Sequence, residues 1–261
     1  MTDTADADSG SVLTVEAGQA CFVYGIVPAA TRLPEDLAGL AGHPPQLLRH
    51  GDVAALVDVV DVDRGWGTRG DLLTYSHVVD AVAAGGQPVL PARFGSVLAS
   101  TDEVTAELLE PNHEEFTALL DGLRGRSQYT LRVRYQPDVA LAEVVAERAD
   151  IAALREETRD QPEEVTYHAR IRLGELVSDA LAQKRSRDAE PIIDVVTAPA
   201  VDFRVRELAG KDDVVEVALL MDQAAVPALE KAAEAIAEQG HDRMRMQLRG
   251  PSAPYDFVPE V

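Results

Sequence analysis

Six histidines and one cysteine are the residues of this sequence best suited to metal binding or catalysis. No two histidines have the i, i+4 spacing that places both on one face of a helix, and a single cysteine cannot complete a zinc site. Two glycine clusters, at 65–67 and 122–125, lack the preceding strand and following helix of a phosphate-binding loop. The sequence therefore predicts no metal, no cofactor and no phosphate loop.

Two histidines have surroundings that could support acid and base catalysis. His113 stands beside Glu114 and Glu115, but it also follows Pro111 and Asn112, where a helix start explains the same residue types. His77 lies alone on a predicted helix. An enzyme built on either histidine and a nearby glutamate remains an alternative, and we expect a protein that is not an enzyme.

The charge of the chain narrows the classes of partner. Lys and Arg number 24 against 45 Asp and Glu, a formal net charge of −21. Such a field repels nucleic acid and anionic membranes, and it favours solubility or keeps an aggregation-prone complex dispersed. The first 18 residues are acidic and lack the features of a signal peptide, and no segment approaches about 20 apolar residues. We expect a cytoplasmic protein without nucleic-acid or membrane partners.

The length and the order of the elements predict two α+β domains, because 261 residues exceed the usual size of one domain. Residues 1–18 have little to bury and are interpreted as a disordered leader. The N-terminal α+β domain is placed at 19–125, with strands at 20–27 and 53–62, a loop at 33–48 and a helix at 71–84. Further helices are expected from Thr101 and from Asn112.

The second domain, at 126–249, has the order β, α, β, β, α, β of the ferredoxin-like fold. Its predicted strands are 128–135, 201–208, 214–221 and 244–248, and its helices are 163–187 and 224–238. Residues 139–155 are interpreted as a helical insertion. The basic run 184–187 is expected to end the long helix, where cations offset the helix dipole.

Two segments framed by proline and glycine offer defined surface features. Leu90–Leu98 holds an arginine and an aromatic residue between rigid and permissive backbone positions, and Gly250–Val258 places two aromatics on a proline-stiffened tail. We expect this tail, 250–261, to pack back on the domains. The candidate partner-binding residues are Leu90, Pro91, Arg93, Phe94, Gly95, Tyr255 and Phe257.

These segments carry a resemblance to the gas vesicle synthesis protein family GvpF/GvpL. The motif Leu-Pro-x-Arg-Phe-Gly at 90–95 and the motif Gly-Pro-x-x-Pro-Tyr-x-Phe at 250–257 occur in the family's order, together with Tyr24–Val27 and the helix carrying 172–176. Three positions depart from the pattern. Ser252 and Ala253 stand where the family commonly has Trp and Pro, and Gln128 stands where it often has Glu.

The resemblance implies an accessory role in gas vesicle assembly. A member of this family would be a minor vesicle-associated protein that contacts the major shell protein and other accessory proteins and limits premature aggregation. The shell subunit is small and hydrophobic, so a highly charged partner could mask its strand edges before assembly. The alternative from another class is a ligand-binding regulatory module, because ferredoxin-like folds often bind small molecules between sheet and helix.

Overall fold

The structure, a computed structural model, describes residues 14–240 and 242–259, and these form two compact units. Unit 1 contains the chain up to Gly125 and the segment that returns to it from Ser252, and unit 2 comprises Arg126–Pro251. The prediction of a leader at 1–18 falls largely on residues outside those described. Its described end forms a turn, in which the N–H of Gln19 donates to the carbonyl of Glu16 at 3.0 Å.

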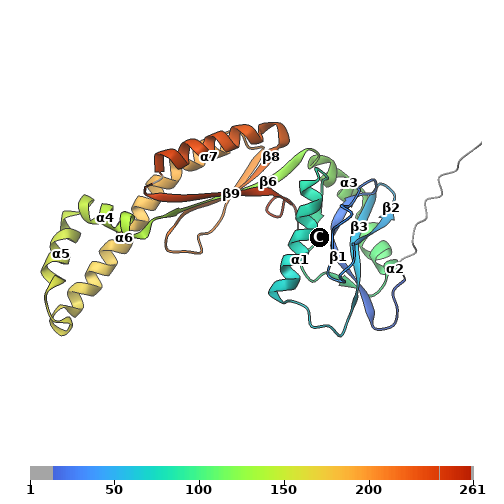
Figure 1. The fold of residues 1–261 in the computed structure, drawn as a ribbon, viewed down its shortest axis with the longest axis horizontal. Helices are drawn as coiled ribbons and strands as arrows, with labels where there is room; N and C mark the ends of the chain where they lie inside the picture. The colour runs from blue at the N-terminus through green and yellow to red at the C-terminus, as the bar shows by residue number, and fades with distance from the viewer. Residues whose placement is uncertain (1–13, 241, 260–261) are drawn as a thin grey trace, which may run out of the picture. The chain divides into compact units, whose positions relative to one another are not determined.

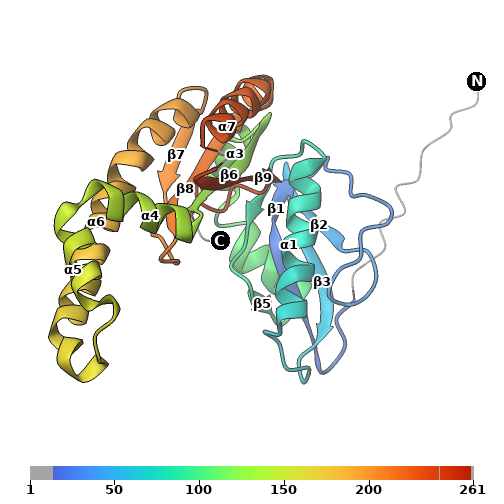
Figure 2. The ribbon, with the colours of Figure 1, turned by 60° about the vertical axis from the view of Figure 1, so that its left-hand side comes forward.

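Unit 1 is an antiparallel sheet with helices on both faces (Figures 1 and 2). The strand order is β2-β3-β1-β4, and the short β5 also pairs with β1. The helix α1 lies on one face, and α2 and α3 lie on the other. The elements are β1 (Gln19–Pro28), β2 (Gln46–His50), β3 (Val53–Asp61), α1 (Arg69–Ala84), β4 (Leu90–Pro91), β5 (Val97–Leu98), α2 (Thr101–Glu103), the π-helix η1 (Val104–Leu109) and α3 (His113–Gly122).

The start of α1 is fixed by a capping box. The Thr68 side chain accepts from the Asp71 N–H, and the Asp71 carboxylate accepts from the Thr68 N–H at 3.1 Å. Arg64 donates to the same carboxylate at 2.9 Å. These bonds satisfy N–H groups that a helix start leaves without partners, and they orient the buried face of α1 toward the sheet.

Unit 2 is a four-stranded antiparallel sheet in the order β7-β8-β6-β9, with two crossover helices on one face (Figure 1). The chain order of these six elements, β6-α6-β7-β8-α7-β9, is the split βαββαβ order. The bounds are β6 (Arg126–Tyr135), α4 (Pro137–Glu147), α5 (Ala149–Arg159), α6 (Glu163–Thr197), β7 (Asp202–Val205), β8 (Asp213–Asp222), the 3-10 helix η2 (Gln223–Ala225), α7 (Val226–Gly240) and β9 (Met244–Ser252). The α+β fold class predicted from the sequence is confirmed.

Several boundaries differ from the sequence prediction. The long helix runs to Thr197 with Pro191 inside it, so the basic residues at 184–187 lie in mid-helix and not at its end. The predicted helix at 139–155 is two helices, α4 and α5, that meet at Arg148. The strand expected at 201–208 spans only Asp202–Val205.

The helices α4 and α5 pack along the N-terminal half of α6 (Figure 1). Their small core contains Val144, Ile151 and Ala180. The second half of α6 contributes Ile192 and Val196 to the core beneath the sheet. A single helix therefore links two apolar clusters of unit 2.

Candidate functional site

Residues of the predicted segment Leu90–Leu98 and of the predicted tail 250–261, which are far apart in the sequence, meet in unit 1 around one hollow. Its volume is about 370 Å³. Two of the elements that line it are the surface of α1 and the segment that follows β4. The lining residues are Leu72, Tyr75, Ser76, Pro91, Ala92, Arg93, Phe94, Tyr255, Val258 and Pro259. We call this feature the α1 hollow.

The backbone of 90–95 is held firmly by β1 and α1. Leu90 and Pro91 pair with Ile26 and Gly25 of β1, and Leu90 is fully buried. The N–H of Ala92 donates to the carbonyl of Tyr24 at 2.9 Å, and the Tyr75 hydroxyl donates to the carbonyl of Ala92. Leu90 therefore positions the segment and cannot itself touch a partner.

A tight turn presents Arg93 and Phe94 at the surface. Gly95 has a φ of 93°, a region that favours glycine, and the N–H of Ser96 donates to the carbonyl of Arg93 at 3.0 Å. Phe94 packs edge-to-face on Tyr75, with ring centroids 5.5 Å apart, while Arg93 is exposed. The hollow thus combines an aromatic wall with an exposed cationic side chain.

The returning C-terminal segment completes the other side of the hollow. Ala253 is fully buried in the core of unit 1, and its N–H donates to Asp80 of α1 at 2.9 Å. The Tyr255 phenol lies beside the Asp80 carboxylate and the Ser76 hydroxyl, while the whole residue is 37% exposed. Burial raises the pKa of Asp80, and the bonds from Ala253 and Tyr255 partly offset this.

Sequence reasoning found only part of this lining. It named Pro91, Arg93, Phe94 and Tyr255, all of which border the hollow; Phe257 is partly buried and Gly95 shapes the turn. It missed the contribution of α1, because Leu72 and Tyr75 share the apolar spacing of a core-facing helix. Tyr75 is 4% exposed, but Leu72 is 47% exposed at the rim.

The most deeply buried polar pair of unit 1 has a structural role. The Tyr24 hydroxyl donates to Asp58 at 2.7 Å and accepts from the N–H of Leu40 at 2.7 Å. The N–H of Ala41 donates to the same Asp58 oxygen at 3.2 Å. Burial raises the pKa of Asp58, which is 1% exposed. This pair anchors the loop between β1 and β2 and is closed to solvent.

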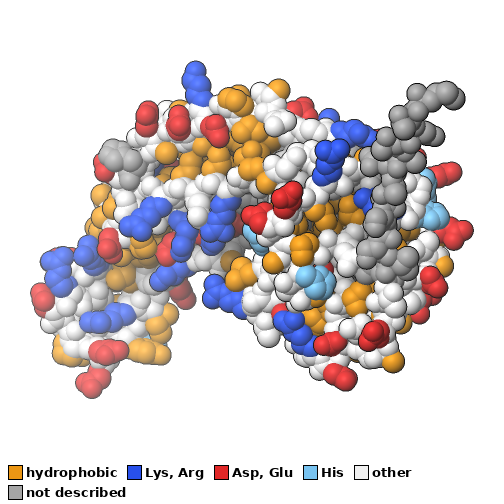
Figure 3. Space-filling model, turned by 45° about the vertical axis from the view of Figure 1, so that its right-hand side comes forward, with side chains coloured by type: hydrophobic (Ala, Val, Ile, Leu, Met, Phe, Trp, Pro, Cys, Tyr) orange, Lys and Arg blue, Asp and Glu red, His pale blue; other side chains and the backbone are white. Residues whose placement is uncertain are grey.

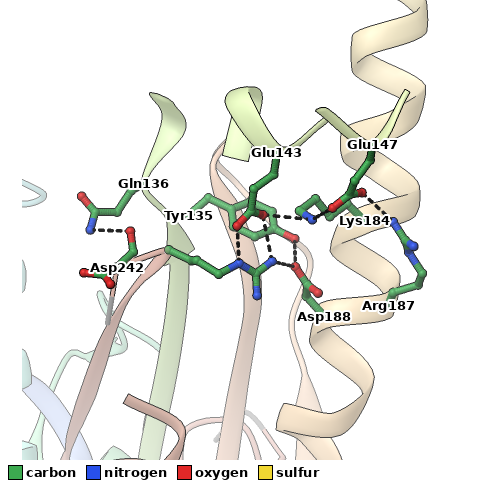
Figure 4. A network of polar contacts seen from close by, with 9 residues as sticks. Tyr135, Gln136, Glu143, Glu147, Lys184, Arg187, Asp188 and Asp242 are labelled. Carbon is green, nitrogen blue, oxygen red and sulfur yellow. Dashed lines mark hydrogen bonds and ion pairs between the residues drawn. The ribbon is translucent and has the colours of Figure 1, made fainter. Parts of the chain in front are cut away.

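A charged network in unit 2 resembles a catalytic cluster only in composition (Figure 4). Arg243 contacts Glu143 at 2.6 Å and Asp188 at 2.8 Å, and the Tyr135 hydroxyl donates to Asp188 at 2.7 Å. Lys184, whose side chain is 6% exposed, contacts Glu147 at 2.7 Å. Each of these groups is bonded to an oppositely charged or hydrogen-bonding neighbour, so the network ties α4, α6 and the start of β9 together.

Of the two histidines considered for catalysis, His113 has a structural contact. The N–H of Asp52 donates to Nε2 of His113 at 3.3 Å, which holds the turn between β2 and β3 against α3. His77 is exposed on α1. Among the described residues, no three or more His, Cys, Asp or Glu side chains are grouped so that they could hold a metal.

Helices long and apolar enough to cross a membrane are absent from residues 14–240 and 242–259. The longest helix, α6, is interrupted by charged residues along its whole length.

Comparisons with known proteins agree on one family. The family model described as "Gas vesicle synthesis protein GvpL/GvpF" matches residues 20–259. "Gas vesicle protein F" of Streptomyces sp. (strain CB03234) is 30% identical, over 91% of this chain and 98% of its own length. "Gas vesicle protein L" of the same strain is 29% identical, over 91% and 92%.

The fold is also similar to that of a solved structure. The crystal structure of the gas vesicle protein GvpF from Anabaena sp. PCC7120 superposes with a TM-score of 0.77 at 20% identity. The superposition covers 93% of this chain and 99% of that one.

Proposed function

Because this chain belongs to the gas vesicle synthesis protein GvpL/GvpF family, we propose that it binds the hydrophobic shell protein through the α1 hollow and keeps that protein soluble until it assembles. The family gives the chain an accessory role related to gas vesicles. The proposal adds the partner, the surface and the effect on aggregation. It places the protein in the cytoplasm, in contact with the shell protein and with other accessory proteins.

The proposal depends on one observation, which is that residues of 90–95 and of 252–259 line the same hollow. The two stretches are separated by more than 150 residues, yet both line the same surface of unit 1. A packing role alone explains the buried members, Leu90 and Ala253. It does not explain why exposed Arg93, Leu72 and Tyr255 surround a hollow.

The chemistry of the hollow suits an apolar segment. Phe94, Tyr75, Pro91 and Val258 give it apolar walls, and its volume of about 370 Å³ accommodates one or two side chains of a partner. Aromatic and arginine side chains in a preformed pocket are typical of the residues that dominate binding energy. The turn at Gly95 and the pairing with β1 hold these walls in place before any partner arrives.

The charge of unit 1 supports an effect on aggregation. By sequence, unit 1 carries 6 basic and 21 acidic side chains, a formal net charge of −15. A shell protein bound to this unit would join a complex that repels other such complexes. Apolar edges of the shell protein would then meet each other less often.

Co-expression with the shell protein tests the proposal. The wild-type chain should keep the shell protein in a soluble complex, and Arg93→Ala or Phe94→Leu should release it into the insoluble fraction. Arg32→Ala is the matched control, because Arg32 is exposed in unit 1 and does not line the hollow. Purified proteins that fail to associate at tens of micromolar, about −6 kcal/mol, would overturn direct binding.

A further inference from the structure

The sheet of unit 2 has one face covered by helices and one face rich in arginine. Leu131, Val133, Val217 and Leu219 belong to the core under α6 and α7. Side chains alternate along a strand, so the neighbouring positions point to the opposite face. Those positions hold Arg132 and Arg134 of β6, Arg204 of β7, Arg206 just after it, and Arg245 and Arg249 of β9. Figure 3 shows Lys and Arg side chains gathered on the visible surface of unit 2.

Acidic side chains of β8 partly neutralise the middle of this face. Arg132 and Arg134 contact the buried carboxylate of Asp213 at 2.8 and 3.1 Å. Arg206 contacts Glu216 at 2.8 Å. The strand order β7-β8-β6-β9 places β9 at the edge, away from β8. These three arginines share two carboxylates, so one positive charge is left over on this face, and Arg245 and Arg249 of β9 add to it.

The two arginines of β9 have little to bind within the chain. Arg249 donates to the side chain of Gln247 at 2.9 Å, and Arg245 makes no hydrogen bond or ion pair with any residue that the structure describes. Both are exposed. Arg249 follows Arg245 by four positions along the strand, which corresponds to about 13 Å.

Arg245 and a second arginine, Arg134, both line a small hollow of about 190 Å³. Tyr135, Gln136, Pro137 and Asp212 complete the lining. Two guanidinium groups that share a hollow repel one another, and Asp212 is the only carboxylate of this lining. A carboxylate entering the hollow would be attracted by both arginines and could bind either one through two parallel hydrogen bonds.

We propose that the face of β9 marked by Arg245 and Arg249 is a docking surface for an acidic, extended segment of a partner protein. Charge complementarity selects the occupant, since two exposed arginines without a carboxylate partner among the described residues attract an acidic segment even in a chain of net charge −21. A ligand that pairs with both arginines needs at least two carboxylates about 13 Å apart, a spacing that an extended acidic segment provides. Nucleic acid is disfavoured, because unit 2 as a whole carries 18 basic and 24 acidic side chains. This surface is separate from the α1 hollow, and it does not depend on shell-protein binding.

Fluorescence anisotropy with a labelled deca-glutamate peptide tests the docking surface. The full chain at low salt should bind this probe, and 300 mM NaCl should weaken binding at least tenfold, since the contacts are ionic. The double variant Arg245→Glu/Arg249→Glu should lose at least tenfold in affinity. The matched control is Arg172→Glu/Lys231→Glu, which changes the charge equally on exposed helical residues and should lose less than twofold.

The proposal would be overturned by absence of binding at low salt, by an equal loss in both double variants, or by tighter binding of a labelled deca-thymidine oligonucleotide than of the peptide. Competition by millimolar inorganic phosphate alone would also contradict an extended ligand and indicate a site for small anions. If the charge reversal prevents folding, Arg245→Gln/Arg249→Gln gives the same comparison with a smaller change.

Discussion

Removing the Asp80 carboxylate should loosen the C-terminal segment from unit 1. The N–H of Ala253 donates to Asp80 at 2.9 Å and is fully buried, so Asp80→Ala leaves a buried donor without a partner. Such a loss costs about 1–3 kcal/mol. Burial raises the pKa of Asp80, so its ionised form is itself disfavoured, and the variant regains part of that loss. We expect a net destabilisation of about 1–2 kcal/mol.

The chain offers a probe that reports unit 1 alone. Trp66 is the single tryptophan, and its ring lies 5.9 Å from that of Phe22 in the core of unit 1. Most helical residues belong to α4, α5, α6 and α7 of unit 2, so far-UV circular dichroism reports mainly that unit. With a urea m-value of about 1–3 kcal/mol/M, the midpoint followed by Trp66 fluorescence should fall by about 1 M. The midpoint followed by circular dichroism should move less.

Two further variants test whether the lost hydrogen bond to Ala253 causes the destabilisation of Asp80→Ala. Asp80→Asn keeps an oxygen that accepts from Ala253 and should restore most of the stability. Glu107→Ala removes an exposed carboxylate of the same unit and should change the midpoint little. The reasoning would be refuted if Asp80→Ala behaved like Glu107→Ala, or if Asp80→Asn were as unstable as Asp80→Ala.

Three other predictions concern the remaining contacts. The bond from Arg132 lowers the pKa of Asp213, so this carboxylate stabilises the fold above its ordinary pKa of 3.8, and the contribution is lost as pH falls through its lower folded value. Asp213→Asn should unfold more easily than wild type at pH 7, and the difference, followed by circular dichroism, should shrink as pH falls below 3.8. Gly25→Ala would bring a Cβ against the carbonyl of Leu90 and should cost about 1–3 kcal/mol in Trp66-monitored unfolding; an unchanged midpoint would contradict the close approach of β1 and β4. Lys184→Met should lower the free energy of unfolding by more than the roughly 1 kcal/mol of a surface ion pair and by less than the about 3–5 kcal/mol of a fully buried one. The reason is that the Lys184 side chain is 6% exposed while its two glutamate partners are partly solvated. Thermal unfolding followed by circular dichroism measures this loss, and a value outside the range would contradict a half-buried ion pair.

The fold class could be predicted from the sequence because apolar periodicity is a local signal. Val53–Val62 and Gln128–Tyr135 are long, strongly patterned runs, and each forms a strand. The end of α6 was missed because Pro191 and the basic run at 184–187 both suggest a helix end. Lys184 and Arg187 are instead held by glutamates of α4, a contact across about 40 residues that no local pattern reveals.

The sequence marked the two segments that line the α1 hollow, but it did not predict that they meet there. Proline and glycine marked 90–95 and 250–258 as shaped segments, since these residues restrict or free the backbone. That both segments line one hollow depends on the bond from Ala253 to Asp80, which joins residues more than 170 positions apart. The part played by Leu72 could not be separated from ordinary helix packing.

Site-specific photo-crosslinking tests the central claim most directly. A benzophenone amino acid replaces Leu72, which is 47% exposed at the rim of the α1 hollow, or exposed Arg172 on α6 as the control, and each variant is irradiated with the purified shell protein. Binding through the α1 hollow predicts a crosslinked product of the two chains from position 72, lost when Phe94→Leu is added, and little product from position 172. Equal yields from both positions, or product from position 172 alone, would contradict it.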